Sequence, residues 1–205
     1  MESKLEEILN VSEQLFRRNG IRSVSMDDIS NALGVSKKTL YKHVSDKSRL
    51  VKLTLENVIA RDRLQQKDCE KGENAIDSFY LVYKNVTDMI RQANFAVEFD
   101  LQKYYPNLYA KMQQLRREKM KTGVRENLER GIREGLYRED LDVEIITKLN
   151  VLLSEAMHDY DFLEENKDRL IHILQVNFDY HLHAIVTEKG LQVYLDILKR
   201  NKNLF

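Results

Sequence analysis

The stretch Val24–Leu50, VSMDDISNALGVSKKTLYKHVSDKSRL, decides how the first part of this 205-residue chain folds. Ser25 is followed three residues later by Asp28, which is the spacing of a capping box and predicts a short helix that starts after Ser25. Gly34 supplies a tight turn, and Ser36 is suited to cap a second helix that continues to about residue 44. Two short helices joined by a tight glycine turn predict a helix-turn-helix.

The second helix of this pair is expected to have one apolar face and one basic face. Val35 and Leu40 are placed to pack against the first helix, and the small Ala32 is expected where the two helices cross. Residues 34–50 hold five Lys or Arg against the single acid Asp46, although the whole chain has 33 basic and 33 acidic residues. A local basic patch on a neutral protein favours short-range binding of phosphates.

The same segment resembles the DNA-binding domain of TetR-family repressors, whose pattern is roughly Ile-Ala-x-x-x-Gly-Val-Ser-x-x-x-Leu-Tyr-x-His-Phe-x-x-Lys-x-x-Leu. Ser30 and Val44 stand where the family usually has Ala and Phe, and Lys38 stands where a Gly is common in the recognition helix. The resemblance covers about the first 50 residues and implies a bacterial transcription regulator that binds double-stranded DNA. The positions that match the family pattern are Ile29, Gly34, Val35, Ser36, Leu40, Tyr41, His43, Lys47 and Leu50.

Five residues are candidates for contacts with DNA phosphates. Ser25 and Ser36 stand at helix starts, where hydroxyl and free N–H groups favour phosphate oxygens. The resemblance implies phosphate contacts for Tyr41, His43 and Lys47. Two alternatives stay open, which are Tyr41 as a core aromatic with a wet hydroxyl and His43 as a cap at the C-terminal end of its helix.

The candidates for contacts with base edges lie on the same helix and are Lys37, Lys38, Thr39 and Lys42. A lysine can donate to guanine O6 and N7, and a threonine methyl group can contact thymine. Taken alone, a lysine-rich helix face is usually just solvated, so this assignment depends on the family pattern around it.

The remainder of the chain predicts an all-α protein of two domains. It contains one Pro and seven Gly, and its apolar residues recur at helical spacing. We expect a helix-turn-helix domain over 1–50, a connecting helix over about 46–68, and a helical effector-binding and dimerisation domain over 72–205. Further helices are predicted over 4–19, 75–93, 95–105, 107–134, 141–163 and 167–187, with a stop at Gly190 and a tail helix over 191–199.

The two helices expected over 141–163 and 167–187 are apolar on more than one face. A helix that is apolar on two faces must bury both, so the second face predicts a homodimer. A two-fold dimer reads a palindromic operator with half-sites one or more DNA turns apart, roughly 34–36 Å per turn. The apolar residues are Leu149, Val151, Leu152, Leu153, Ala156 and Met157 on the first helix, and Leu170, Ile171, Ile173, Leu174, Val176 and Phe178 on the second.

Aromatic residues and methionines of the second domain are candidates for an effector pocket. Their spacing alone favours plain core, whereas the resemblance implies a cavity whose small-molecule effector releases a repressor from DNA. Two rivals stay open. One is an architectural DNA-binding dimer without a ligand, and the other is a small-molecule- or partner-binding helical protein whose DNA head is non-functional. The pocket candidates are Tyr80, Tyr83, Phe95, Glu98, Phe99, Met112, Met157 and His158, with Glu98 and His158 as the polar groups.

No catalytic site, metal site or cofactor is expected. Cys69 is the only cysteine, which suits a reducing cytosol. His181 and His183 are two residues apart and point to different sides of a helix, so they do not share a metal easily. The first residues lack the order of a signal peptide, and charges interrupt every apolar run well before 18 residues. We therefore expect a cytoplasmic protein that is not an enzyme and does not cross a membrane.

Overall fold

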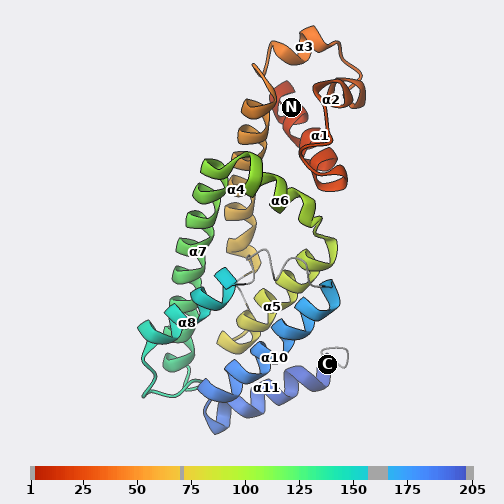
Figure 1. The fold of residues 1–205 in the computed structure, drawn as a ribbon. Helices are drawn as coiled ribbons and strands as arrows, with labels where there is room; N and C mark the ends of the chain where they lie inside the picture. Colours follow the sequence, from red (N-terminus) through yellow and green to blue (C-terminus); the bar gives the residue numbers. More distant parts are fainter. Residues whose placement is uncertain (1–2, 70–71, 157–165, 202–205) are drawn as a thin grey trace. The chain divides into compact units, whose positions relative to one another are not determined.

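The computed structural model describes residues 3–69, 72–156 and 166–201, and every regular element within these ranges is a helix (Figure 1). This confirms the predicted all-α fold. In the described residues, an isolated antiparallel bridge joins Tyr137 to Val186. The helices are α1 Lys4–Asn19, α2 Met26–Ala32, α3 Lys37–Tyr41, α4 Lys47–Cys69, α5 Ala75–Gln92, α6 Phe95–Tyr104, α7 Pro106–Arg133, α8 Val143–Ala156, α10 Lys167–Ile185 and α11 Glu188–Arg200.

The chain divides into two compact units, each of which combines segments that are distant in sequence. Unit 1 consists of residues 1–66 and 93–112, and unit 2 consists of residues 67–92 and 113–205. Unit 1 therefore contains the segment expected to form the helix-turn-helix, together with most of α4, all of α6 and the start of α7. The burial of Leu101 and Met112 in the core of unit 1 explains why these later segments belong to it.

The core of unit 1 joins α1, α2, α3 and α4 around a few large aliphatic side chains. Ile8, Ile29, Leu40 and Leu50 are each fully buried in this core. Since α2 has seven residues and α3 has five, neither is long enough to be stable alone. Their positions therefore depend on this shared core.

The crossing of α2 differs from the sequence prediction at one position. Ser30 is buried and donates a hydrogen bond from its hydroxyl to the Asp27 carbonyl at 3.0 Å, whereas Ala32 is exposed. The expected inward role of Ala32 is therefore wrong. Positions 26, 29, 30 and 33 follow the i, i+3, i+4, i+7 spacing of one helix face, and residue 32 lies off that face.

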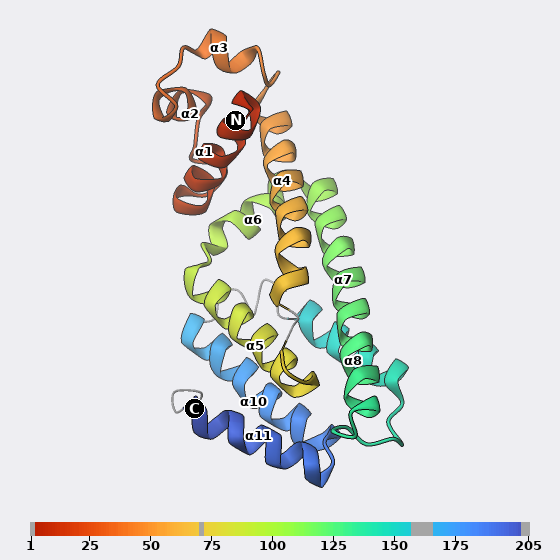
Figure 2. The ribbon, with the colours of Figure 1, turned by 180° about the vertical axis from the view of Figure 1, so that it is seen from behind.

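Unit 2 packs α5, α10 and α11 against one another, and Figure 1 and Figure 2 both show these three helices side by side. The Phe178 ring lies at the centre of an aromatic cluster, stacked on Phe79 with 5.2 Å between ring centroids and on Tyr83 with 4.6 Å. Tyr194 is fully buried, and its hydroxyl donates to Asp179 at 2.7 Å. Stacked rings with satisfied hydroxyl groups are a dense form of core packing.

Two glycines mark places where unit 2 brings backbone and side chain into close contact. A Cβ atom at Gly131 would lie 2.0 Å from the ring of the buried Tyr137, and a Cβ atom at Gly190 would lie 2.1 Å from the Leu136 carbonyl oxygen. Gly190 was predicted to stop a helix, and that prediction is wrong. It lies in the first turn of α11, where its N–H donates to the Thr187 hydroxyl that caps the helix.

Candidate nucleic-acid interface

The start of α2 is fixed by the predicted capping box. The Ser25 hydroxyl oxygen accepts from the Asp28 N–H at 3.1 Å, and the Asp28 carboxylate accepts from the Ser25 N–H at 2.8 Å and from its hydroxyl at 2.7 Å. These hydrogen bonds hold the pKa of Asp28 below its usual value. The capping role of Ser25 is confirmed, and its hydroxyl is already occupied in the fold.

The turn between α2 and α3 follows the same local chemistry. Gly34 adopts a φ of +63°, a conformation that favours glycine, and the Val35 N–H donates to the Ser30 carbonyl at 3.0 Å. Ser36 caps α3 by accepting from the Thr39 N–H at 3.2 Å, and its hydroxyl lies 2.9 Å from the Thr39 hydroxyl. The helix ends at Tyr41, three residues earlier than predicted.

One side of α3 is buried and the other faces solvent. Leu40 is fully buried, whereas Lys38, Lys42 and His43 are exposed. Tyr41 is 47% exposed, so the alternative of a core aromatic is wrong for this residue. A large aromatic ring in water beside several cations is a surface suited to binding a polyanion.

Lys37 differs from its neighbours because it has a partner within the fold. Its ammonium group lies 2.5 Å from a carboxylate oxygen of Asp27 on α2. The hydrogen bond to Asp27 raises the pKa of Lys37 above its ordinary value. Both side chains are more than half exposed, so this ion pair contributes little to stability and can open when a stronger anion arrives.

Lys47 begins α4 and is half-buried. Its ammonium group donates to the carbonyl oxygen of Arg22 at 3.1 Å, and partial burial lowers the pKa of Lys47. Asp46 caps the same helix by accepting from the Arg49 N–H at 2.8 Å, and this bond lowers the pKa of Asp46. The sequence pattern predicted a phosphate contact for Lys47 and did not predict its partner in the fold.

Helix α6 supplies further contacts to the turn between α1 and α2. The Asp100 carboxylate accepts from the Arg22 N–H at 2.7 Å, and the Arg22 guanidinium donates to the Tyr104 hydroxyl at 2.9 Å. The Asn94 side chain donates to the Arg18 carbonyl at 3.1 Å. Sequence reasoning missed these residues, although an acid at position 100 beside Leu101, inside an aromatic segment, was a usable signal for a buried carboxylate.

The residues predicted to line an effector pocket have different surroundings. Tyr80 and Tyr83 pack around Phe178 in unit 2, with 6.3 Å and 4.6 Å between ring centroids. Met112 is buried in the core of unit 1. Phe95, Glu98 and Phe99 lie on α6, which also belongs to unit 1, whereas Met157 and His158 lie outside the described residues.

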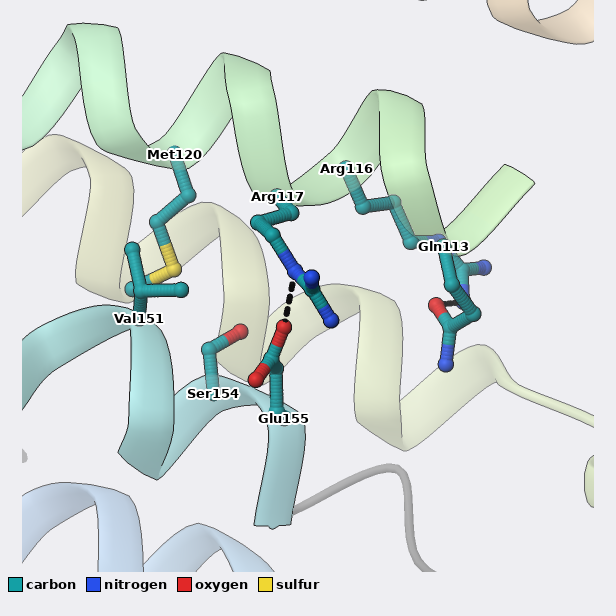
Figure 3. Close-up of a pocket in the computed structure, with 7 residues that line it drawn as sticks. All are labelled: Gln113, Arg116, Arg117, Met120, Val151, Ser154 and Glu155. Carbon is teal, nitrogen blue, oxygen red and sulfur yellow. Dashed lines mark hydrogen bonds and ion pairs between the residues drawn. The ribbon is translucent and has the colours of Figure 1, made fainter. Parts of the chain in front are cut away.

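A hollow of about 230 Å³ lies between α7 and α8 within unit 2 (Figure 3). Arg117 pairs with Glu155 across it, and Met120 lies against Val151 at one end (Figure 3). The hollow therefore combines charged, polar and apolar groups. Its lining residues are Gln113, Arg116, Arg117, Met120, Val151, Ser154 and Glu155, none of which was among the predicted pocket residues.

The described part of the chain contains neither a metal-binding cluster nor a membrane-spanning helix. Within residues 3–69, 72–156 and 166–201, no group of three or more His, Cys, Asp or Glu is placed to hold a metal ion. Among the helices of these ranges, none is both long enough and apolar enough to cross a membrane.

Comparison with known sequences places the helix-turn-helix in a family. Residues 8–53 match the family described as bacterial regulatory proteins, tetR family. The uncharacterized HTH-type transcriptional regulator YvaF of Bacillus subtilis is 26% identical over 114 residues, which are 55% of this chain and 60% of that protein. The match thus spans less than two thirds of that relative's length.

Solved structures share the fold over nearly the whole chain. A TetR-family transcriptional regulator from Agrobacterium tumefaciens has a TM-score of 0.67 at 16% identity, with 90% of this chain and 98% of that chain covered. A TetR-family transcriptional regulator from Streptomyces coelicolor has a TM-score of 0.67 at 20% identity, with 87% and 93% covered. The ketosteroid transcriptional regulator KstR2 of Mycobacterium tuberculosis has a TM-score of 0.55 at 18% identity, with 92% and 97% covered.

The fold and the site together define the class of this protein, which is an all-helical chain with an N-terminal helix-turn-helix and a C-terminal helical domain. Residues 8–53 are thus similar to the DNA-binding segment of the tetR family of bacterial regulatory proteins. The chain as a whole shares its fold with TetR-family regulators of known structure.

Proposed function

We propose that this protein regulates transcription by binding double-stranded DNA with the exposed face of α3. The observation that carries the proposal is the arrangement around Leu40, whose burial turns Tyr41 and the neighbouring lysines toward solvent. A five-residue helix with this polarity fits the role of a recognition helix, which presents a short basic face to the major groove. The match of residues 8–53 to the tetR family supports the same function.

We assign the DNA contacts by side-chain chemistry. Lys38, Thr39 and Lys42 are proposed to contact base edges, because ammonium groups donate to guanine and methyl groups contact thymine. Tyr41 and His43 are proposed to contact phosphates, because both side chains are exposed at the C-terminal end of α3 and carry polar groups that bond phosphate oxygens.

Three further predicted contacts have competing bonds within the fold. Lys37 is proposed to reach a base edge after its ammonium group leaves Asp27. Ser25 and Ser36 use their hydroxyl groups in helix caps. We therefore propose that the caps of Ser25 and Ser36 present backbone N–H groups to phosphates, so that the serines contribute by shaping the helix starts.

We propose that the protein acts as a homodimer joined through α8 and α10. Ile145, Leu149 and Leu152 follow one face of α8 and are exposed, the last two at 58% and 60%. Val176 and Tyr180 are exposed one turn apart on α10, Tyr180 at 74%. Exposed apolar residues at helical spacing on two helices of one unit support an interface with a second copy, which would give the protein the two-fold symmetry of a palindromic operator.

We also propose that a small-molecule effector releases the protein from DNA, so that it acts as a repressor. The hollow between α7 and α8 is the proposed effector site, where Arg116 and Arg117 lie near the apolar Met120 and an acidic ligand would replace Glu155 as the partner of Arg117. This chemistry favours a ligand with an acidic group and an apolar body. The M. tuberculosis relative, by its name a ketosteroid regulator, supports small-molecule control in general.

DNA binding is tested by selecting sequences from a random duplex pool and measuring affinity for the selected duplex by fluorescence anisotropy. We expect a palindrome, and we expect Lys38→Ala and Lys42→Ala to weaken binding by about tenfold each, the scale of one lost contact of about 1–3 kcal/mol. Lys84→Ala, an exposed lysine of α5, is the matched control and should bind like the parent. Selection of no sequence would contradict the proposal.

Dimer formation is tested by light scattering coupled to size exclusion. We expect the parent to have twice the mass of the chain, and Leu149→Glu with Leu152→Glu to convert it to a monomer, because each substitution places a charge in an apolar interface. Lys84→Glu introduces the same charge on α5 and should leave the mass unchanged. A monomeric parent at micromolar concentration would contradict the dimer.

A further inference from the structure

The turn between α1 and α2 is held from the side of α6. Gly20 has a φ of +80°, and a Cβ atom there would lie 3.2 Å from the Asp100 carboxylate and 3.4 Å from the Ala96 methyl group. At the N-cap of α6, the Asn94 side chain donates to the Arg18 carbonyl. The backbone of residues 18–22 thus lies against α6 at several points, all within unit 1.

The peptide groups on both sides of Arg22 are bonded to charged side chains from two different helices. Its N–H donates to Asp100 of α6 at 2.7 Å, and its carbonyl accepts from Lys47 of α4 at 3.1 Å. Its guanidinium adds a bond to the Tyr104 hydroxyl and lies 5.3 Å from the centroid of that ring. Hydrogen bonds to charged partners are about twice as strong as neutral ones, so these bonds fix the turn more firmly than an ordinary loop.

The charges of this cluster support one another. Asp100 is only 7% exposed, and a buried carboxylate needs a partner of opposite charge. The Lys47 ammonium interacts favourably with both Asp100 and Asp28, and Asp28 closes the capping box of α2. Lys47 therefore links two features of unit 1, which are the Asp100 carboxylate of α6 and the capping box that starts α2.

We propose that Asp100 and Lys47 are positioning residues, which hold the Arg22 peptide and thereby set the orientation of α2 and α3 for DNA binding. Lys47 acts on the turn through this bond, and its ammonium group keeps two further donor hydrogens for a phosphate. The link to DNA affinity rests on the proposed function. The two hydrogen bonds that Asp100 and Lys47 make to the Arg22 peptide groups, called the clamp below, are a property of the fold itself.

The clamp is tested without DNA by amide hydrogen exchange in the full-length protein. We expect Asp100→Ala to raise the exchange rate of the Arg22 amide by about tenfold or more, because the N–H loses its acceptor. Lys47→Met should raise the same rate by a smaller factor, because it loosens the turn through the Arg22 carbonyl. Asp100→Asn keeps a neutral acceptor oxygen and should restore part of the protection. Gln102→Ala on α6 and Lys52→Met on α4 are matched controls, since both residues are exposed.

The role in DNA binding is tested by the salt dependence of affinity for the selected duplex. A lysine that contacts a phosphate contributes about 0.9 to the slope of log K against log salt concentration. We expect Asp100→Ala to weaken binding by about tenfold with the slope unchanged, because Asp100 brings no cation to a phosphate. An unchanged affinity of Asp100→Ala for the selected duplex, or a slope that falls by about 0.9, would overturn the positioning role.

The two arms separate the failure of this inference from the failure of the proposed function. Unchanged Arg22 exchange in both Asp100→Ala and Lys47→Met would overturn the clamp whether or not DNA binds. Selection of no DNA sequence would end the proposed function and the link to affinity, while the exchange data would still decide the clamp. Should Asp100→Ala fail to fold by circular dichroism, the Lys47→Met exchange result decides alone.

Discussion

Replacing Gly131 by alanine should destabilise unit 2, although alanine is normally the better helix former. Gly131 lies in α7, and a glycine-to-alanine change inside an exposed helix gains about 1 kcal/mol. Here the new Cβ atom would lie 2.0, 2.3 and 2.6 Å from three ring carbons of Tyr137. Carbon atoms need about 3.5 Å, so the ring or the helix must move.

The ring of Tyr137 has little freedom to move away from Gly131. It is fully buried, and its hydroxyl donates to Asn127 at 3.0 Å. Asn127 in turn donates to the Ala75 carbonyl at 2.8 Å, which ties α7 to the start of α5. Overpacking costs about 1–3 kcal/mol, and a broken buried hydrogen bond costs about 1 kcal/mol more. After the helix gain, Gly131→Ala should lower the free energy of unfolding by about 1–3 kcal/mol.

The assay is urea unfolding, measured by circular dichroism. All variants are measured at one protein concentration, because the apparent stability of a dimer depends on concentration. Gly123→Ala is the matched control, because Gly123 lies in the same helix and its added Cβ atom would meet nothing within 4 Å. The control should raise the free energy of unfolding by about 0.5–1 kcal/mol. If Gly131→Ala is at least as stable as the parent, or changes the free energy of unfolding as Gly123→Ala does, the packing argument is refuted.

Three further predictions concern other parts of the fold. Burial lowers the pKa of His181 to about 4, so its contribution to stability is complete above about pH 6.5 and is lost as the pH falls toward 4. The loss is up to about 3 kcal/mol, and urea midpoints of His181→Phe should fall less steeply over that range. Tyr194→Phe removes the bond to Asp179 and should cost about 1–2 kcal/mol in the same assay. Ser25→Ala removes the cap of α2 and should cost about 1 kcal/mol, visible as a lower melting temperature.

Features that depend on neighbouring residues in the sequence were predictable. Ser25 with Asp28 fixed the start of α2, and Ser36 fixed the start of α3, because a cap and the N–H it satisfies are at most three residues apart. The choice of Ala32 as the crossing residue was wrong because it followed side-chain type. The helical phase, which places Ser30 beside Ile29 on the inward face, was the better guide.

Features that depend on residues far apart in the sequence were not predictable. Gly190 was predicted to stop a helix, but its lack of a side chain serves the close approach of Leu136, more than fifty residues earlier. The ring of Tyr83, a predicted pocket residue, is stacked on Phe178, a partner that helical spacing does not predict. In each case the sequence gives the residue type correctly and leaves its partner open, since many pairings satisfy the same pattern.

The proposed DNA surface depends on residues elsewhere in unit 1. Helices of seven and five residues cannot hold their own positions, so α2 and α3 owe theirs to Ile29 and Leu40 in the shared core. The turn that leads into α2 owes its position to Asp100 and Lys47. A motif of short helices is therefore a product of the whole unit. It follows that a change on α6, outside the motif, can alter the DNA surface while every residue of that surface stays the same.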